Sequence, residues 1–157
     1  PTHGNASLKN FYESTIPTLV AIDGSTKYLS LNDLVQTISE ILAYETNQPE
    51  QAALNIADTN TQINPNDHSD HLHSSLILQK VARNLGIKTV RLYEEYATNA
   101  KEQNVFGDAF LVSAGTWGAT ASGLSDGLHD STWNESHNIW IGRQYFRDVL
   151  LVELEKE

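Results

Sequence analysis

The fold is decided by residues 52–95, AALNIADTNTQINPNDHSDHLHSSLILQKVARNLGIKTVRLYEE. A short apolar run at 52–57 suits a strand, and the polar stretch at 58–67 predicts a loop. Apolar residues at helical spacing predict a helix from Ser69 to about Asn84, which Gly86 ends. β-branched and aromatic residues at 88–95 predict a second strand. The order strand, loop, helix, strand is typical of a parallel βαβ unit, and it places the chain in the α/β class.

The flanking sequence extends this pattern on both sides. Ser30 and Asp33 resemble a capping box and predict a helix over residues 31–45, after a loop-rich segment at 1–29. Beyond the second strand, helices are predicted at 108–119 and 134–147. The last ten residues, 148–157, read as an acidic tail. We therefore expect residues 1–147 to form one domain or part of a slightly larger one.

Charge and composition exclude several classes of function. The 157 residues include 20 acidic and 10 basic side chains, and a net charge of −10 argues against an extended nucleic-acid interface. No stretch of 18 apolar residues is present, so we expect no membrane span and a soluble protein, either cytoplasmic or secreted. Cysteine and methionine are both absent. Histidine and carboxylate side chains therefore remain as the obvious metal ligands.

The richest chemistry lies in residues 67–73, DHSDHLH, at the predicted start of the second helix. His68 and His71 are three residues apart, so the first helical turn can place both on one side. A helix N-terminus favours the neutral imidazole that a metal requires, and Asp67 or Asp70 can orient such a ring. The alternative interpretation is that these are solvated residues that cap the helix, because aspartate is a preferred N-cap.

The motif His68-Ser69-Asp70-His71 and its context resemble the PIG-L/LmbE-like metal-dependent N-acetylglucosamine deacetylases. The resemblance covers roughly residues 4–147, and includes the segments 4–8, 15–17 and 23–25, the strand and loop before the motif, the strand at 90–96, and residues 142–145. It implies a Rossmann-like three-layer fold with a mostly parallel sheet. It also implies a hydrolase that removes an acetyl or related acyl group from an N-acetylated amino sugar or similar small amide.

The resemblance assigns roles to three residues of the motif. His71 would be a ligand of zinc or another divalent metal. His68, in a protonated form, would polarise the substrate carbonyl or stabilise the tetrahedral intermediate, and Asp70 would hold one of the two imidazoles. The substrate-binding residues are left open.

The chain departs from the family in one large respect. The family's other metal ligands and its general base lie in an Ala-His-Pro-Asp-Asp-Glu-type motif near the N-terminus, which this chain lacks; His3 has no neighbouring carboxylate. Three explanations compete: the first strand or strands belong to a missing N-terminal segment or a second chain, the protein is a non-catalytic binding or interaction domain with the deacetylase fold, or other residues such as Asp58 complete the site. We expect the first, since a sheet without its first strands exposes an edge that a partner segment would cover.

Several further residues have a functional and a structural interpretation. Asp58 follows a predicted strand, where functional carboxylates occur, but it also suits a turn. Aromatic residues that could form a sugar-stacking platform are Tyr93, Tyr96, Trp117, Trp133 and Trp140, although buried aromatics are usually core. Arg143 could reach a substrate hydroxyl or form a salt bridge, and His129 and His137 are interpreted as surface residues.

Overall fold

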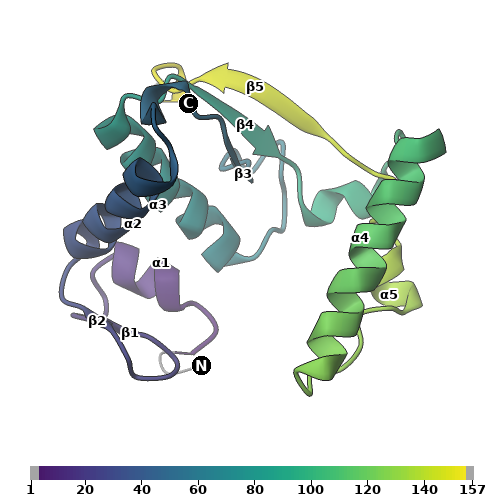
Figure 1. Cartoon of the computed structure of the whole chain (residues 1–157), viewed down its shortest axis with the longest axis horizontal. Coiled ribbons are helices and arrows are strands. Elements are labelled where there is room, and N and C mark those ends of the chain that lie inside the picture. Colours follow the sequence, from purple (N-terminus) through teal and green to yellow (C-terminus); the bar gives the residue numbers. More distant parts are fainter. Residues whose placement is uncertain (1–3, 155–157) are drawn as a thin grey trace.

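The computed structural model describes residues 4–154 and has a mixed α/β architecture. Within that range it contains a three-stranded sheet, a two-stranded hairpin and five α-helices. Helices α1 (Ser7–Tyr12), α2 (Leu31–Glu45) and α3 (Ser69–Leu85) gather near the sheet, whereas α4 (Gly107–Asp126) and α5 (Glu135–Asn138) lie apart from them (Figure 1). No described helix combines the length and the apolar character needed to cross a membrane.

The main sheet has the strand order β3-β4-β5. Strands β3 (Leu54–Ala57) and β4 (Thr89–Tyr93) are parallel, as the βαβ pattern predicts, with Ala57 opposite Tyr93. Strand β5 (Phe146–Leu150) pairs antiparallel with β4. The described sheet is therefore mixed, with β3 at one edge and β5 at the other.

Two apolar clusters hold the helices and the sheet together. One lies between the sheet and α3 and contains the fully buried residues Val90, Leu92 and Ala82. The other joins α1, α2 and α3 through Phe11, Leu34, Val35, Ile77 and Val81. Because the C-terminal half of α3 contributes to both clusters, the clusters fix the position of this helix relative to the sheet.

Local sequence signals account for the bounds of the two longest N-terminal helices. Ser30 accepts a hydrogen bond from the backbone N–H of Asp33, as the predicted cap requires, and α2 begins at Leu31. At the end of α3, Gly86 adopts a left-handed conformation with φ of 70° and its N–H contacts the carbonyls of Ala82 and Arg83. A short helical segment, η1 (Pro49–Gln51), separates α2 from β3.

The segment before α2 has more regular structure than its loop-rich sequence suggests. Helix α1 buries Phe11, and strands β1 (Leu19–Val20) and β2 (Lys27–Tyr28) form an antiparallel hairpin. The turn between these strands contains Gly24 at φ of 72°.

The prediction of a helix over residues 134–147 is wrong. Only α5 is helical there, because Asn134 caps a single turn and Gly142 adopts φ of 80°, which ends helical geometry. Phe146 begins β5, so the predicted boundary at 147 falls within a strand, and Leu151 is buried in the sheet cluster. The helix predicted at 108–119 is present and extends to Asp126 as α4. A second short segment, η2 (Tyr96–Ala100), follows β4.

Candidate functional site

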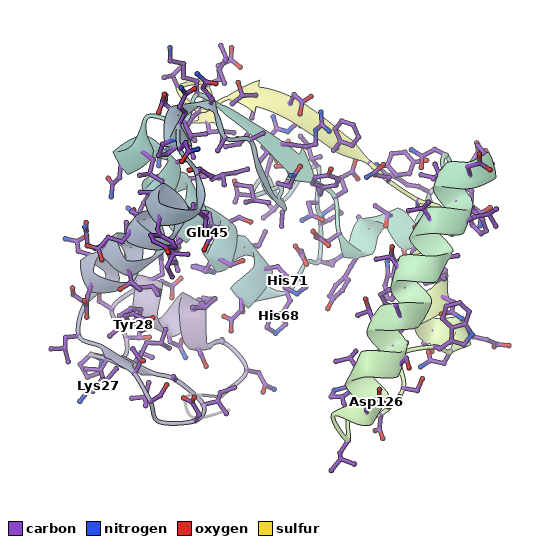
Figure 2. All side chains as sticks on the ribbon, in the orientation of Figure 1. Lys27, Tyr28, Glu45, His68, His71 and Asp126 are labelled. Atoms are coloured by element: carbon purple, nitrogen blue, oxygen red, sulfur yellow. The ribbon has the colours of Figure 1, made fainter. Side chains whose placement is uncertain are left out.

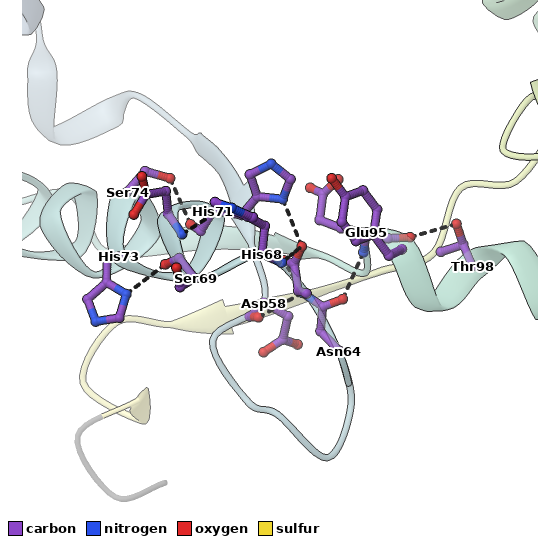
Figure 3. A network of polar contacts seen from close by, with 12 residues as sticks. Asp58, Asn64, His68, Ser69, His71, His73, Ser74, Glu95 and Thr98 are labelled. Carbon is purple, nitrogen blue, oxygen red and sulfur yellow. Dashed lines mark hydrogen bonds and ion pairs between the residues drawn. The ribbon is translucent and has the colours of Figure 1, made fainter. Parts of the chain in front are cut away.

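The loop between β3 and α3 is organised around Asn64, a fully buried side chain. Its amide group donates to the carbonyl oxygen of Asp58 at 3.1 Å and to the carboxylate of Asp67 at 2.9 Å. Its side-chain oxygen accepts from the backbone N–H of Glu95 at 2.9 Å. Asn64 thus links the end of β3, the start of α3 and the end of β4 (Figure 3). Sequence reasoning placed it only in a polar loop, because no local pattern distinguishes it from the neighbouring asparagines.

Asp67 holds His71 in a defined orientation. The side chain of Asp67 is fully buried, and its Oδ1 lies 2.7 Å from Nδ1 of His71 while also accepting from the backbone N–H of His68 at 2.7 Å. A carboxylate can only accept, so Nδ1 of His71 carries a proton. In the neutral ring, Nε2 then has a free lone pair, which is the form that binds a metal.

His68 has the opposite arrangement. It is the N-cap of α3, and its Nδ1 accepts a hydrogen bond from the backbone N–H of Asp70 at 3.1 Å. Nδ1 therefore carries no proton, and the neutral ring presents Nε2–H as a donor. This geometry corrects the expectation of a protonated His68, because a ring protonated on both nitrogens cannot accept the capping hydrogen bond.

The two imidazoles lie side by side at the N-terminal end of α3 (Figure 2). Their ring centroids are 5.5 Å apart, which confirms that the first helical turn places both on one side. The ring of Tyr96 packs against His71 at a centroid distance of 5.4 Å. The side chain of His71 is 43% exposed and lines a groove that an incoming group could enter. The N-terminal end of α3 thus presents the Nε2 lone pair of His71 beside the Nε2–H group of His68.

Asp70 does not make the contact that the resemblance implies. Its carboxylate accepts from the backbone N–H of Lys9 at 3.1 Å and so connects α3 to α1, whereas Asp67 holds the imidazole. The third histidine of the cluster, His73, also points to α1. Its Nδ1 lies 2.6 Å from the carbonyl oxygen of Ser69, and its ring packs edge-on against Tyr12. Both Asp70 and His73 therefore fix the packing of α1.

Asp58 is buried and engaged by other residues. Its carboxylate accepts from Nε and Nη2 of Arg147 at 2.6 and 3.0 Å, and from the backbone N–H of Asn60 at 2.9 Å. Asp58 directly follows β3 and Arg147 lies in β5, so this ion pair connects the two edge strands of the sheet. The carboxylate acts as a turn former and an ion-pair partner.

Glu95 is a site residue that sequence reasoning missed. Burial raises the pKa of its carboxyl, the charge of Asp67 raises the pKa further, and His71 opposes the shift. Glu95 lies at the end of β4, next to the loop that Asn64 organises. This position brings its carboxyl close enough to interact electrostatically with Asp67 and His71. The only sequence signal was its place at the carboxyl end of a predicted parallel strand, where functional groups concentrate.

The residues of this site do not form a complete metal centre by themselves. Within residues 4–154, no group of three or more histidine and carboxylate side chains is arranged to hold a metal ion. His3 lies outside the described residues. His71 supplies one oriented ligand, and a metal would need further ligands from elsewhere.

Two cavities meet at the carboxyl end of β4. A groove of about 320 Å³ is lined by β3, by α3 residues that include His71, and by Tyr93 and Glu95. A larger pocket of about 740 Å³ lies between η2, α4 and the segment after α5, and it is also lined by Tyr93 and Glu95. Four of the five aromatic residues considered for a stacking platform line this pocket: Tyr93, Tyr96, Trp117 and Trp140. Trp133 instead lies against Gly118 and is 51% exposed.

The other predicted positions divide between surface and pocket. His129 is exposed, as expected, and its Nδ1 contacts the carbonyl oxygen of Asp130. His137 is also exposed but lines the larger pocket. Arg143 lines the larger pocket, donates to backbone carbonyl oxygens and forms no salt bridge with any described residue.

A scan against protein-family models and searches of curated proteins and of solved structures found no match to this chain.

Proposed function

We propose that this protein is part of a zinc-dependent N-deacetylase of the PIG-L/LmbE type, which hydrolyses an acetyl or related acyl group from an amino sugar or similar small amide. In this proposal the described mixed sheet belongs to a Rossmann-like three-layer domain, and a segment or chain beyond residues 4–154 completes it. The observation that carries the proposal is the complementary pair of imidazoles at the start of α3, one oriented by Asp67 and the other by the backbone of Asp70.

The chemistry of the two rings fits amide hydrolysis. His71 has the tautomer expected of a zinc ligand, because the buried carboxylate of Asp67 holds the proton on Nδ1 and leaves Nε2 unprotonated. A zinc ion bound there supplies Lewis acidity, which polarises a carbonyl and makes water nucleophilic at neutral pH. His68 donates Nε2–H to the carbonyl oxygen and stabilises the negative charge that develops on it. A neutral imidazole can perform this role beside a helix N-terminus.

The edge of the sheet offers a place for the missing ligands. Within the described residues β3 pairs with β4 alone, so its outer edge presents unpaired backbone groups. The groove of about 320 Å³ is lined both by residues 55–57 of this strand and by His71. A strand added there would bring its carboxyl end close to His71, and a carboxylate or histidine at that end could share the metal.

The alternative function is a non-catalytic binding or interaction domain that retains the deacetylase fold. One observation favours it: residues 4–154 contain no group of three or more potential metal ligands in a common arrangement. In that case the histidine cluster would serve as the cap of α3 and as the anchor of the loop that precedes it.

The test is to purify the protein from its natural source and to measure its zinc content, any co-purifying chain by intact mass, and acetate release from N-acetylglucosamine. We expect zinc together with a second chain or a longer polypeptide. His71→Ala should abolish zinc binding, whereas His68→Ala should retain zinc and lose turnover. His129→Ala is the matched control, because that histidine is exposed and distant in sequence from the motif.

Two results would contradict the proposal. Absence of both zinc and a completing segment would favour the non-catalytic alternative. Unchanged zinc content and unchanged acetate release in both motif variants would reject the assignment of His68 and His71.

A further inference from the structure

The larger pocket differs in character from the histidine site beside it. Its volume of about 740 Å³ is in the range of small-molecule sites. One wall is α4, through residues such as Ala109, Val112 and Thr116. The opposite wall is aromatic and includes Tyr96 and Trp140, whose ring centroids are 5.6 Å apart.

The polar hydrogens of three aromatic side chains of this pocket are used within the protein. Nε1 of Trp117 donates to the side-chain oxygen of Asn138 at 2.8 Å, and Nε1 of Trp140 donates to the carbonyl oxygen of Tyr96 at 3.4 Å. The hydroxyl of Tyr145 donates to the carbonyl oxygen of Glu102 at 2.8 Å. These side chains therefore offer ring surfaces to a ligand, and apolar groups pack well on such surfaces.

The cations near the pocket are also engaged. Nε of Arg143 donates to the carbonyl oxygen of Lys101 at 2.7 Å, and its Nη1 donates to the carbonyl oxygen of Ile139. Nζ of Lys101 lies 2.5 Å from Oε2 of Glu94 and 4.6 Å from the ring centroid of Tyr145. Glu95 adds a second carboxylate to the lining. Among the described residues that line the pocket, Glu94 and Glu95 supply two carboxylates and Arg143 supplies one guanidinium, whose Nε and Nη1 donate to backbone carbonyls. The lining therefore has no excess of positive charge that would attract an anionic ligand.

The pocket continues from the histidine site. Tyr93 and Glu95 line both cavities, and the ring of Tyr96 contacts His71 on one side and Trp140 on the other. The ring of Tyr96 thus lies between His71 and the aromatic wall of the pocket.

We propose that this pocket binds an uncharged aromatic or apolar substituent of the substrate, attached to the group whose amide faces His68 and His71. The inference deepens the proposed function and rests on it for the identity of that amide. The preferred substrate is therefore an N-acyl amino sugar with a neutral apolar aglycone, and a free or phosphorylated sugar binds more weakly.

The experiment compares the benzyl, methyl and carboxybenzyl glycosides of N-acetylglucosamine by isothermal titration calorimetry on the purified protein. Burial of a benzyl ring predicts binding at least about tenfold tighter than that of the methyl glycoside. The carboxybenzyl glycoside should lose this advantage. Thr116→Trp and Ser113→Phe fill the pocket from α4 and should abolish the preference for benzyl. Leu111→Trp is the matched control, because that side chain is 67% exposed on the same helix and does not line the pocket.

Equal affinity for the benzyl and methyl glycosides, tight binding of the carboxybenzyl glycoside, or an unchanged preference in both pocket variants would overturn the inference. The benzyl glycoside of glucose separates this inference from the proposed function, because it has no amide. If it binds to the wild-type protein and not to Thr116→Trp, the pocket assignment stands even where acetate release is absent. If it fails to bind although acetate is released from N-acetylglucosamine, the pocket assignment alone is wrong.

Discussion

Replacement of Arg147 by methionine should destabilise the protein strongly, because Arg147 neutralises a fully buried carboxylate. Asp58 has no exposed surface and accepts two hydrogen bonds from the guanidinium, at 2.6 and 3.0 Å. In Arg147→Met the carboxylate keeps the donor from Asn60 but loses its counter-charge. Removal of one partner from a buried ion pair typically costs about 3–5 kcal/mol. The Arg147 side chain is 27% exposed, so water reduces this cost, and we expect about 3 kcal/mol, at the lower end of that range.

The assay is urea unfolding followed by tryptophan fluorescence and circular dichroism, with the free energy of unfolding from linear extrapolation. Arg91→Met is the matched control, since Arg91 makes a similar two-point contact with Asp148 on the same sheet. That pair is 38% and 48% exposed, so its loss should cost much less. The double variant Asp58→Asn/Arg147→Met should recover part of the loss, because it removes the buried charge.

The reasoning would be refuted if Arg147→Met were no more destabilising than Arg91→Met. It would also fail if the effects of Asp58→Asn and Arg147→Met were additive, because coupled partners in a buried pair do not behave independently.

Two further predictions concern pH dependence and backbone conformation. Burial raises the pKa of Glu95 above its ordinary value of 4.5, so the folded state holds this proton more tightly than the unfolded chain, and stability should fall as pH rises from that value through the raised pKa. Glu95→Gln should therefore be more stable than wild type at neutral pH, with a difference that shrinks towards pH 4 in urea titrations; a difference that is constant with pH would contradict the assignment. Gly142→Ala should destabilise more than Gly24→Ala, because both residues have positive φ but only at Gly142 would a Cβ approach Phe110, at 2.9 Å. If Gly142→Ala and Gly24→Ala lowered the midpoint urea concentration equally, the Phe110 side chain would be able to move away from the new Cβ at no cost, and the prediction would be wrong.

The predicted fold was most accurate where signals are local. Residues 31–45 carry both a cap and helical periodicity, and α2 has these bounds. Residues 52–95 also behaved as predicted, because the apolar run, the glycine stop and the β-branched strand all act within a few residues of one another.

The C-terminal region was predicted least well because its structure depends on distant pairing. Phe146 to Leu150 becomes a strand through its pairing with β4, more than fifty residues earlier in the sequence. Charged residues within that run obscured it: Arg147 and Asp148 find their partners in Asp58 and Arg91. A strand whose polar side chains are neutralised by remote residues has no clear signature in its own sequence.

The sequence by itself determined α2, the unit from β3 to β4 and the place of the histidine cluster, because helical caps, glycine stops and residue spacing act over one or two turns. Only the tertiary structure decided which carboxylate orients which imidazole. Asp67 could hold His71 because Asn64 and the ends of two strands fix the loop around it, whereas Asp70 was directed to Lys9 by the packing of α1. In each neutral imidazole, the hydrogen bond at Nδ1 decides which of the two ring nitrogens carries the proton, and the fold sets that hydrogen bond.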